Sequence, residues 1–205
     1  MNNATYKHNF NAGPSILPTS VLREAAASVL NHNESGLSIL EIGHRTPTFT
    51  AILEEARQLV RELMMLSDDH EVLFLHGGAS TQFMQVPMNL LDARESAAYA
   101  DTGVWSSKAI QEARAFGKVD IVCSSKEQNY TSIPDDFAVP HDAKYFHITT
   151  NNTIYGTQWH NIPHTSNVLV ADMSSDIFSR RLRFSDFGLI YAGAQKNIGP
   201  AGTTL

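Results

Sequence analysis

Short, mostly apolar runs alternate with stretches of helical period along residues 71–205. Such runs, bounded by polar or turn residues, are typical of buried strands. Between them, apolar residues at helical spacing predict one helix through Phe83 to Leu91, which Pro87 should kink, and another from about Trp105 to Phe116. The runs predicted to form strands are residues 72–75, 97–100, 119–122, 145–148, 168–171 and 189–192.

Strands that alternate with helices predict an α/β domain with a mostly parallel sheet and helices on both faces. In such sheets the ligand lies beyond the carboxyl ends of the strands. The residues that directly follow each predicted strand are therefore the first candidates for chemistry.

The first 70 residues have a different pattern. An irregular arm carries a turn signal at Gly13 and Pro14. A helix is predicted to start near residues 18–20 and to end by 33–36, and Pro47 opens a second helix that runs to about Met64. We therefore expect an N-terminal arm over residues 1–15 and one large domain over residues 16–205.

Composition excludes several classes of partner. The 205 residues carry a net charge of −6, with Lys+Arg 15 and Asp+Glu 21, and the basic residues are scattered. This arrangement disfavours binding to nucleic acid or to an anionic membrane. Neither an apolar leader nor a run of membrane-spanning length is found in the sequence, so we expect a cytoplasmic protein.

The single cysteine, Cys123, excludes an internal disulfide and a multi-cysteine metal site. It lies in the mostly apolar run 119–123, where a buried structural thiol is the simpler interpretation than a nucleophile. We predict no metal site in this chain.

A glycine-rich segment, Gly-Gly-Ala-Ser-Thr at 77–81, lies between a predicted strand and a predicted helix. Its backbone N–H groups and the helix dipole would converge on a phosphate group. A plain glycine turn with Ser80 or Thr81 as helix N-cap explains the segment equally well.

Three other strand ends carry a candidate side chain, and each has a simpler alternative. Trp105 would stack on a planar ring, or pack in the core. Thr153 would offer a hydroxyl group to a ligand, or belong to a solvated loop. Asp172 would hold a pyridinium nitrogen protonated through a charge-assisted hydrogen bond, or cap the backbone near Ser174.

Small residues surround Lys196 in the segment 191–202, directly after the last predicted strand. A lysine partly removed from water loses its proton more readily and becomes a nucleophilic amine that forms Schiff bases. The alternative is a solvated loop lysine. A phosphate cradle, an aromatic ring, a carboxylate and a lysine at successive strand ends together predict a site for pyridoxal 5′-phosphate (PLP).

Motifs along the whole chain resemble the phosphoserine aminotransferase family, within the class V, fold-type I PLP-dependent aminotransferases. The fold that the resemblance implies is the PLP-binding large domain of that class. The segments that carry the resemblance are residues 11–14, 43–45, 76–83, 87–91, 102–105, 171–175 and 193–202.

The resemblance implies a role for each candidate around the cofactor ring. Lys196 would form the Schiff base and move the proton between the substrate α-carbon and the cofactor. Asp172 would pair with the pyridine nitrogen, Trp105 would stack on the ring, and Thr153 would hydrogen-bond the phenolic oxygen.

The resemblance also implies the residues that bind anionic groups. The cofactor phosphate would be bound by Ala79, Ser80 and Gln195. Arg45 would bind the substrate carboxylate, with His44 near the substrate's phosphate end. Some relatives have an arginine at the position of Ser80, which helps to bind the substrate phosphate, so other groups must supply that contact here.

The implied reaction moves an amino group from glutamate to 3-phosphohydroxypyruvate, giving 3-phosphoserine and 2-oxoglutarate, with a further role in vitamin B6 biosynthesis. The implied partner is a second copy of the chain, in a homodimer whose active site is completed by the neighbouring subunit. Relatives continue past residue 205 into a smaller C-terminal domain, so we expect that domain to be missing here.

Two alternatives remain open, and two others are disfavoured. The chain is a truncated large-domain fragment without activity, or it is another class V enzyme, such as an alanine–glyoxylate or serine–pyruvate aminotransferase. A cysteine desulfurase needs a mobile catalytic cysteine, which Cys123 in a strand-like run does not provide. A nicotinamide-dependent oxidoreductase is disfavoured because no G-x-G-x-x-G motif follows the first predicted strand.

Overall fold

The structure, a computed structural model, describes residues 7–205. The chain divides into two compact units, Met1–Leu73 and Phe74–Leu205. Each unit is described by itself.

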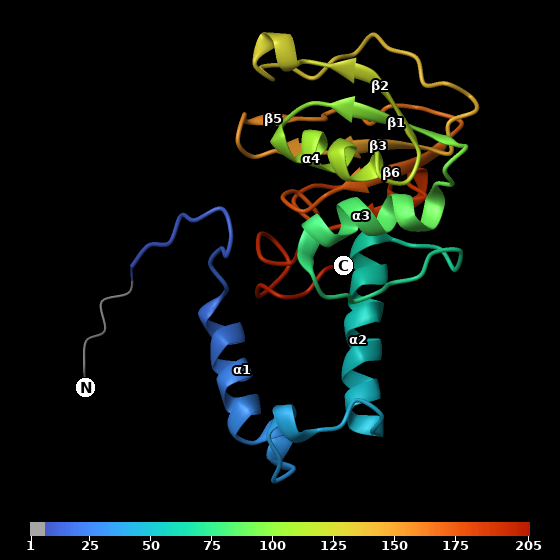
Figure 1. The fold of residues 1–205 in the computed structure, drawn as a ribbon. Helices are drawn as coiled ribbons and strands as arrows, with labels where there is room; N and C mark the ends of the chain where they lie inside the picture. The colour runs from blue at the N-terminus through green and yellow to red at the C-terminus, as the bar shows by residue number, and fades with distance from the viewer. Residues whose placement is uncertain (1–6) are drawn as a thin grey trace. The chain divides into compact units, whose positions relative to one another are not determined.

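The first unit contains helices α1 (Thr19–Leu30) and α2 (Pro47–Met64), joined through two short 3₁₀ helices, η1 (His32–Glu34) and η2 (Ile39–Glu41) (Figure 1). Both predicted α-helices are confirmed, at the predicted starts. Helix α2 begins as its sequence requires, because the Thr46 hydroxyl accepts a hydrogen bond from the Phe49 N–H and proline occupies the first turn. Residues 7–15 form no helix or strand; the rest of the predicted arm lies outside the described residues.

The second unit is built on a five-stranded sheet in the order β2-β1-β3-β6-β7, in which all pairs are parallel (Figure 1). The predicted α/β class with a mostly parallel sheet is confirmed. A short antiparallel pair that was not predicted, β4 with β5, follows β3. The strands are β1 (Ser96–Asp101), β2 (Lys118–Ser124), β3 (Tyr145–Thr149), β4 (Asn151–Asn152), β5 (Thr157–Gln158), β6 (Val168–Asp172) and β7 (Leu189–Tyr191).

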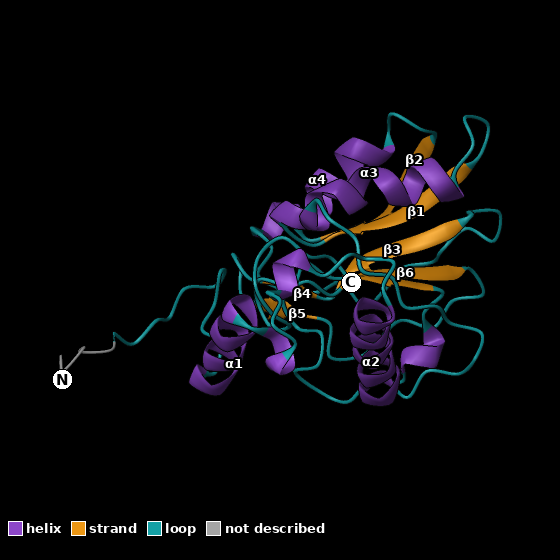
Figure 2. Cartoon of the chain, turned by 90° about the horizontal axis from the view of Figure 1, so that it is seen from below, coloured by secondary structure: helices purple, strands orange, loops and turns teal. Residues whose placement is uncertain are grey.

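Helices α3 (Gly78–Leu90) and α4 (Val104–Ala113) lie side by side on one face of this sheet (Figure 2). Their apolar side chains pack on the residues of β1, β3, β6 and β7 that point to that face. On the opposite face, Phe146 of β3 packs against Phe137, which also contacts Trp159, and neither partner belongs to a helix. In residues 74–205, α-helices therefore cover one face, and irregular segments contribute to covering the other.

The strand predicted at residues 72–75 is wrong. Within the described residues, only Leu75 of this run pairs with another segment, through an antiparallel bridge to Thr204 in which each N–H donates to the other carbonyl at 2.8 Å. Val72 is buried, but Leu73 and Leu75 are 54% and 40% exposed. An apolar run becomes a strand only where a neighbouring backbone satisfies its N–H and C=O groups along its length, and here that happens at one residue.

Cys123 on β2 is half-buried, and burial, with a smaller effect from the Asp101 carboxylate, raises the pKa of its thiol to about 12. A thiol with such a pKa stays protonated and unreactive at neutral pH. Across residues 7–205, no cluster of three or more metal-binding side chains is found. No helix in the same range is long and apolar enough to span a membrane.

Candidate active site

A cavity of about 160 Å³ lies in the second unit, where strands β3 and β6 end and where α3 and α4 begin. It brings together six residues that were predicted separately from the sequence: Ala79, Ser80, Trp105, Asp172, Gln195 and Lys196. The remaining lining residues are Gly78, Phe83, Thr149, Asn151, Ser174 and Ser175.

Lys196 is the basic group of this cavity. Burial lowers the pKa of its ammonium group, and the Asp172 carboxylate opposes that shift. Its Nζ atom lies 5.6 Å from the centre of the Trp105 ring. A lysine whose pKa is lowered by burial has a larger fraction of free amine at neutral pH, as a nucleophile requires.

The loop that carries Lys196 is closed at its base by backbone hydrogen bonds. Ala192 exchanges two bonds with Leu205, each of 2.9 Å, and the Ala194 N–H donates to the Thr203 carbonyl at 2.9 Å. A Cβ atom added at Gly193 would lie 2.7 Å from the Oε1 atom of Gln195, so a larger residue there would displace the Gln195 side chain. These hydrogen bonds fix the backbone at both ends of the loop.

Asp172 ends strand β6 and is 4% exposed. Its Oδ1 atom accepts two hydrogen bonds from Ser174, one from the backbone N–H at 3.0 Å and one from the hydroxyl at 2.6 Å. Burial raises the pKa of this carboxyl group, while the Ser174 hydrogen bonds and the Lys196 charge act against that rise. The carboxylate is thus held in one orientation at the wall of the cavity.

The N-terminus of α3 faces the cavity and depends on two glycines in left-handed conformations, Gly77 (φ +97°) and Gly78 (φ +68°). Gly77 is the N-cap, so Ser80 and Thr81 lie inside the helix and the alternative that either of them caps it is wrong. The Thr81 hydroxyl instead donates to the Gly77 carbonyl at 2.8 Å. Exposed N–H groups at a helix start, with Ala79 and Ser80 in the first turn, form a site suited to an anion.

Trp105, in the first turn of α4, forms an aromatic wall of the cavity. The Lys108 ammonium group also lies over its ring, 4.7 Å from the ring centre. Within the described residues, neither the Trp105 indole N–H nor the Thr149 hydroxyl has a hydrogen-bond partner, although both are buried. Unpaired buried polar groups next to a cavity are expected where a ligand completes the hydrogen bonding.

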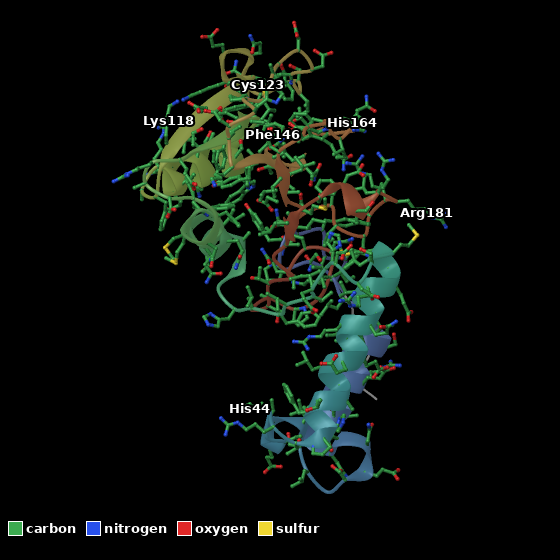
Figure 3. The ribbon with its side chains drawn as sticks, turned by 90° about the vertical axis from the view of Figure 1, so that its right-hand side faces the viewer. His44, Lys118, Cys123, Phe146, His164 and Arg181 are labelled. Atoms are coloured by element: carbon green, nitrogen blue, oxygen red, sulfur yellow. The ribbon has the colours of Figure 1, made fainter. Side chains whose placement is uncertain are left out.

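Three predicted residues do not line this cavity. Thr153 is exposed in the turn between β4 and β5. His44 and Arg45 belong to the first unit, where both are exposed in the turn before α2, and Figure 3 shows His44 projecting away from the ribbon.

Five lining residues were missed as site residues: Phe83, Thr149, Asn151, Ser174 and Ser175. Thr149 had a usable signal, because it is the last residue of β3 and pairs in register with Asp172 of β6. Side chains at the same register point to the same face of a sheet. The sequence indicates Ser174 only as a backbone position near which Asp172 could act as a cap.

The cavity matches PLP part by part, on the chemistry of the residues present. The start of α3 suits the phosphate, the Trp105 ring suits stacking, Asp172 suits the pyridine nitrogen, and Lys196 suits the aldehyde carbon. These groups come from segments far apart in the sequence. Their convergence in one cavity is therefore a property of the fold.

Comparison with known proteins agrees with this geometry. The profile of the family described as aminotransferase class-V matches residues 7–205. The chain is 58% identical over 200 residues to a phosphoserine aminotransferase of Flavobacterium johnsoniae, covering 97% of this chain and 56% of the relative. It is 53% identical over 201 residues to the phosphoserine aminotransferase of Bacillus cereus, with the same coverage.

Solved structures give the same result. A phosphoserine aminotransferase studied for radiation damage of its Schiff base superposes with a TM-score of 0.94 at 48% identity, covering 98% of this chain and 57% of that one. The PLP-bound phosphoserine aminotransferase of Trichomonas vaginalis superposes with a TM-score of 0.90 at 33% identity, covering 97% and 57%. The chain spans a little over half the length of these relatives. Since the family profile matches nearly the entire chain, the protein belongs to the aminotransferase class-V family.

Proposed function

We propose that this chain is the cofactor-binding part of a phosphoserine aminotransferase and binds PLP through Lys196. The observation that carries the proposal is the placement of Lys196 and Asp172 in one cavity with the N-terminus of α3. The names of the most similar relatives support the choice of phosphoserine aminotransferase within class V. Bound PLP supplies an electron sink for breaking a Cα–H bond.

Each residue has a defined task in this proposal. Lys196 would hold the cofactor, and its amine would move the proton at the substrate α-carbon. Asp172 keeps the pyridine nitrogen protonated by a charge-assisted hydrogen bond. Trp105 fixes the plane of the ring. The contact of Thr153 with the phenolic oxygen rests on the resemblance alone, because Thr153 does not line the cavity. The cofactor phosphate is bound by Ala79, Ser80 and Gln195.

The proposed reaction transfers an amino group from glutamate to 3-phosphohydroxypyruvate, giving 3-phosphoserine and 2-oxoglutarate. Arg45 binds the substrate carboxylate, and His44 lies near the substrate phosphate. The proposal includes a cytoplasmic homodimer in which the neighbouring subunit completes the site. These parts rest on the resemblance to the family.

The test is an absorbance spectrum of the purified chain with PLP, before and after glutamate is added. We expect a long-wavelength band that Lys196→Ala abolishes and that glutamate bleaches. Lys108→Ala is the matched control, because its ammonium group also lies over Trp105 although Lys108 does not line the cavity. This variant should keep the band.

Two results would overturn the proposal in different ways. Without a Lys196-dependent band, the cofactor assignment fails for this chain. With a band that glutamate leaves unchanged, the chain binds the cofactor but lacks aminotransferase activity. Bleaching by alanine and not by glutamate would instead favour another class V aminotransferase.

A further inference from the structure

The Ser174 hydroxyl connects Asp172 to the loop that carries Lys196. It donates a hydrogen bond to Asp172 Oδ1 at 2.6 Å and accepts one from the Gly193 N–H at 3.1 Å. Ser174 is 8% exposed. One buried side chain therefore joins the end of β6 to the loop that carries Lys196.

The hydrogen bonds of Ser174 fix the Asp172 carboxylate. A serine hydroxyl has a single proton, and here that proton is directed to Oδ1. The backbone N–H of Ser174 donates to the same oxygen at 3.0 Å. With two donors on Oδ1, the orientation of the carboxylate is held.

Gly193 is the one amide of the loop base that faces Ser174. Its two neighbours along the chain, Ala192 and Ala194, donate to Leu205 and Thr203 on the other side. Amides of an extended segment alternate in direction, so the Gly193 N–H points the opposite way. Ser174 supplies the acceptor on that side, so the loop base is hydrogen-bonded on both sides.

We propose that Ser174 is a positioning residue that couples the orientation of Asp172 to the placement of the Lys196 loop. The inference rests on the proposed function, because the proposed function gives Asp172 and Lys196 their roles. The hydroxyl of Ser174 forms its hydrogen bonds with Asp172 and with the Gly193 N–H. It acts through Asp172 and Gly193.

The neighbouring Ser175 provides a matched control. It lies in the same segment and lines the same cavity, but its hydroxyl donates to the Asn151 carbonyl at 3.0 Å and accepts from the Asn151 amide at 2.9 Å. Replacing Ser175 by alanine therefore removes one hydroxyl near the cavity while both hydrogen bonds of Ser174 remain.

The first measurement uses the cofactor-free chain with ¹³C-labelled aspartate carboxyl groups and follows the Asp172 titration by NMR. We expect Ser174→Ala to raise the Asp172 pKa, because a hydrogen bond to the charged form is lost. The other charges that act on Asp172, Lys196 and Asp176, are unchanged by the substitution. Ser175→Ala should leave the Asp172 midpoint where it is.

The second measurement is the dissociation constant for PLP, read from the Lys196-dependent band. Loss of a hydrogen bond to a charged group predicts binding weaker by about tenfold in Ser174→Ala. The inference is overturned if Ser174→Ala, folded by circular dichroism, keeps both the Asp172 midpoint and the PLP affinity of the parent chain.

Two further results separate the possible failures. An absent band in the parent chain defeats the proposed function, whereas the NMR titration without cofactor still decides the role of Ser174. If Ser174→Ala does not fold, hydrogen exchange at the Gly193 amide of the parent chain is measured instead. Protection of this amide supports the coupling, and exchange as fast as in an exposed loop overturns it.

Discussion

The Nε2 atom of His147 lies 2.8 Å from the Tyr191 hydroxyl, and the hydrogen bond passes across strand β6, which lies between the strands of these two residues. The Tyr99 ring stacks on the His147 ring, with 4.8 Å between the ring centres. The Tyr99 hydroxyl lies 2.7 Å from the Tyr145 hydroxyl. A row of polar aromatic side chains is thus buried where α3 and α4 cover the sheet. Burial lowers the pKa of His147 to about 3, so the imidazole is neutral in the folded protein.

The buried imidazole makes the fold sensitive to acid. The pKa of His147 is lower in the folded protein than in the unfolded chain, where it is 6.5. Its contribution to stability is therefore present above pH 6.5 and is lost as the pH falls towards about 3. We expect His147 to contribute up to about 1.4 kcal/mol per pH unit to the decrease in unfolding free energy over this range. Urea unfolding at pH 7, 6, 5 and 4 should show a smaller decrease in His147→Gln. Exposed His164→Gln is the control, and an equal decrease in both variants would contradict this account.

A second buried cluster surrounds Asp101, at the end of β1. Its carboxylate accepts hydrogen bonds from Ser107 at 2.6 Å, from Ser124 at 3.2 Å and from the Tyr130 hydroxyl at 3.2 Å. Tyr130→Phe removes one donor to a buried charge and should lower the unfolding free energy by about 1.5–3 kcal/mol.

The control for this cluster is Tyr155→Phe. The Tyr155 ring packs on Tyr130 at 4.8 Å, but the residue is 41% exposed. We expect a change of less than about 0.5 kcal/mol for this variant. Equal losses in the two variants, measured by denaturant unfolding, would show that the hydroxyl of Tyr130 is not the cause.

The charge on Asp172 controls the amine of Lys196. Because the carboxylate raises the Lys196 pKa against the effect of burial, Asp172→Asn should lower that pKa further. The rate of labelling by a small amine-reactive reagent, followed by mass spectrometry across pH, should reach half its maximum at a lower pH in the variant. Exposed Lys126 serves as an internal reference, and an unchanged midpoint at Lys196 would refute the coupling.

The start of α3 should not tolerate a side chain at Gly77. An alanine there would adopt φ near +97° and place its Cβ 2.3 Å from the Thr81 hydroxyl oxygen. We expect Gly77→Ala to lower the unfolding free energy by at least about 1–2 kcal/mol. Gly199→Ala is the comparison, since open space surrounds that position. A similar melting temperature for the two variants would show that the left-handed turn is not required.

The three central strands, β1, β3 and β6, could be predicted because they are largely buried on both faces. Continuous apolar runs at 97–100, 145–148 and 168–171 are what a parallel sheet requires, and each lies within an observed strand. The run at 72–75 has the same character but finds a partner only at Leu75, far along the chain. Local apolarity predicts burial, whereas strand pairing depends on what lies alongside.

For the site, too, local sequence predicts some residues, whereas others depend on contacts between distant segments. Asp172 and Lys196 could be predicted because each stands where a strand ends. Ser174 could not, since its role depends on Gly193, a residue that only the fold brings near. The roles of His44 and Arg45 stay predictions, because both belong to the first unit.

The pairing of Leu75 with Thr204, and of Ala192 with Leu205, has a consequence for the order of events during translation. Segments emerge from the ribosome in sequence, and contacts between distant residues wait for the later one. The loop of Lys196 therefore cannot close when Lys196 itself emerges; its base is complete only after residues 203–205 have followed. In a nascent chain that ends at Lys196, the amine is therefore present before the hydrogen bonds at the base of its loop can form.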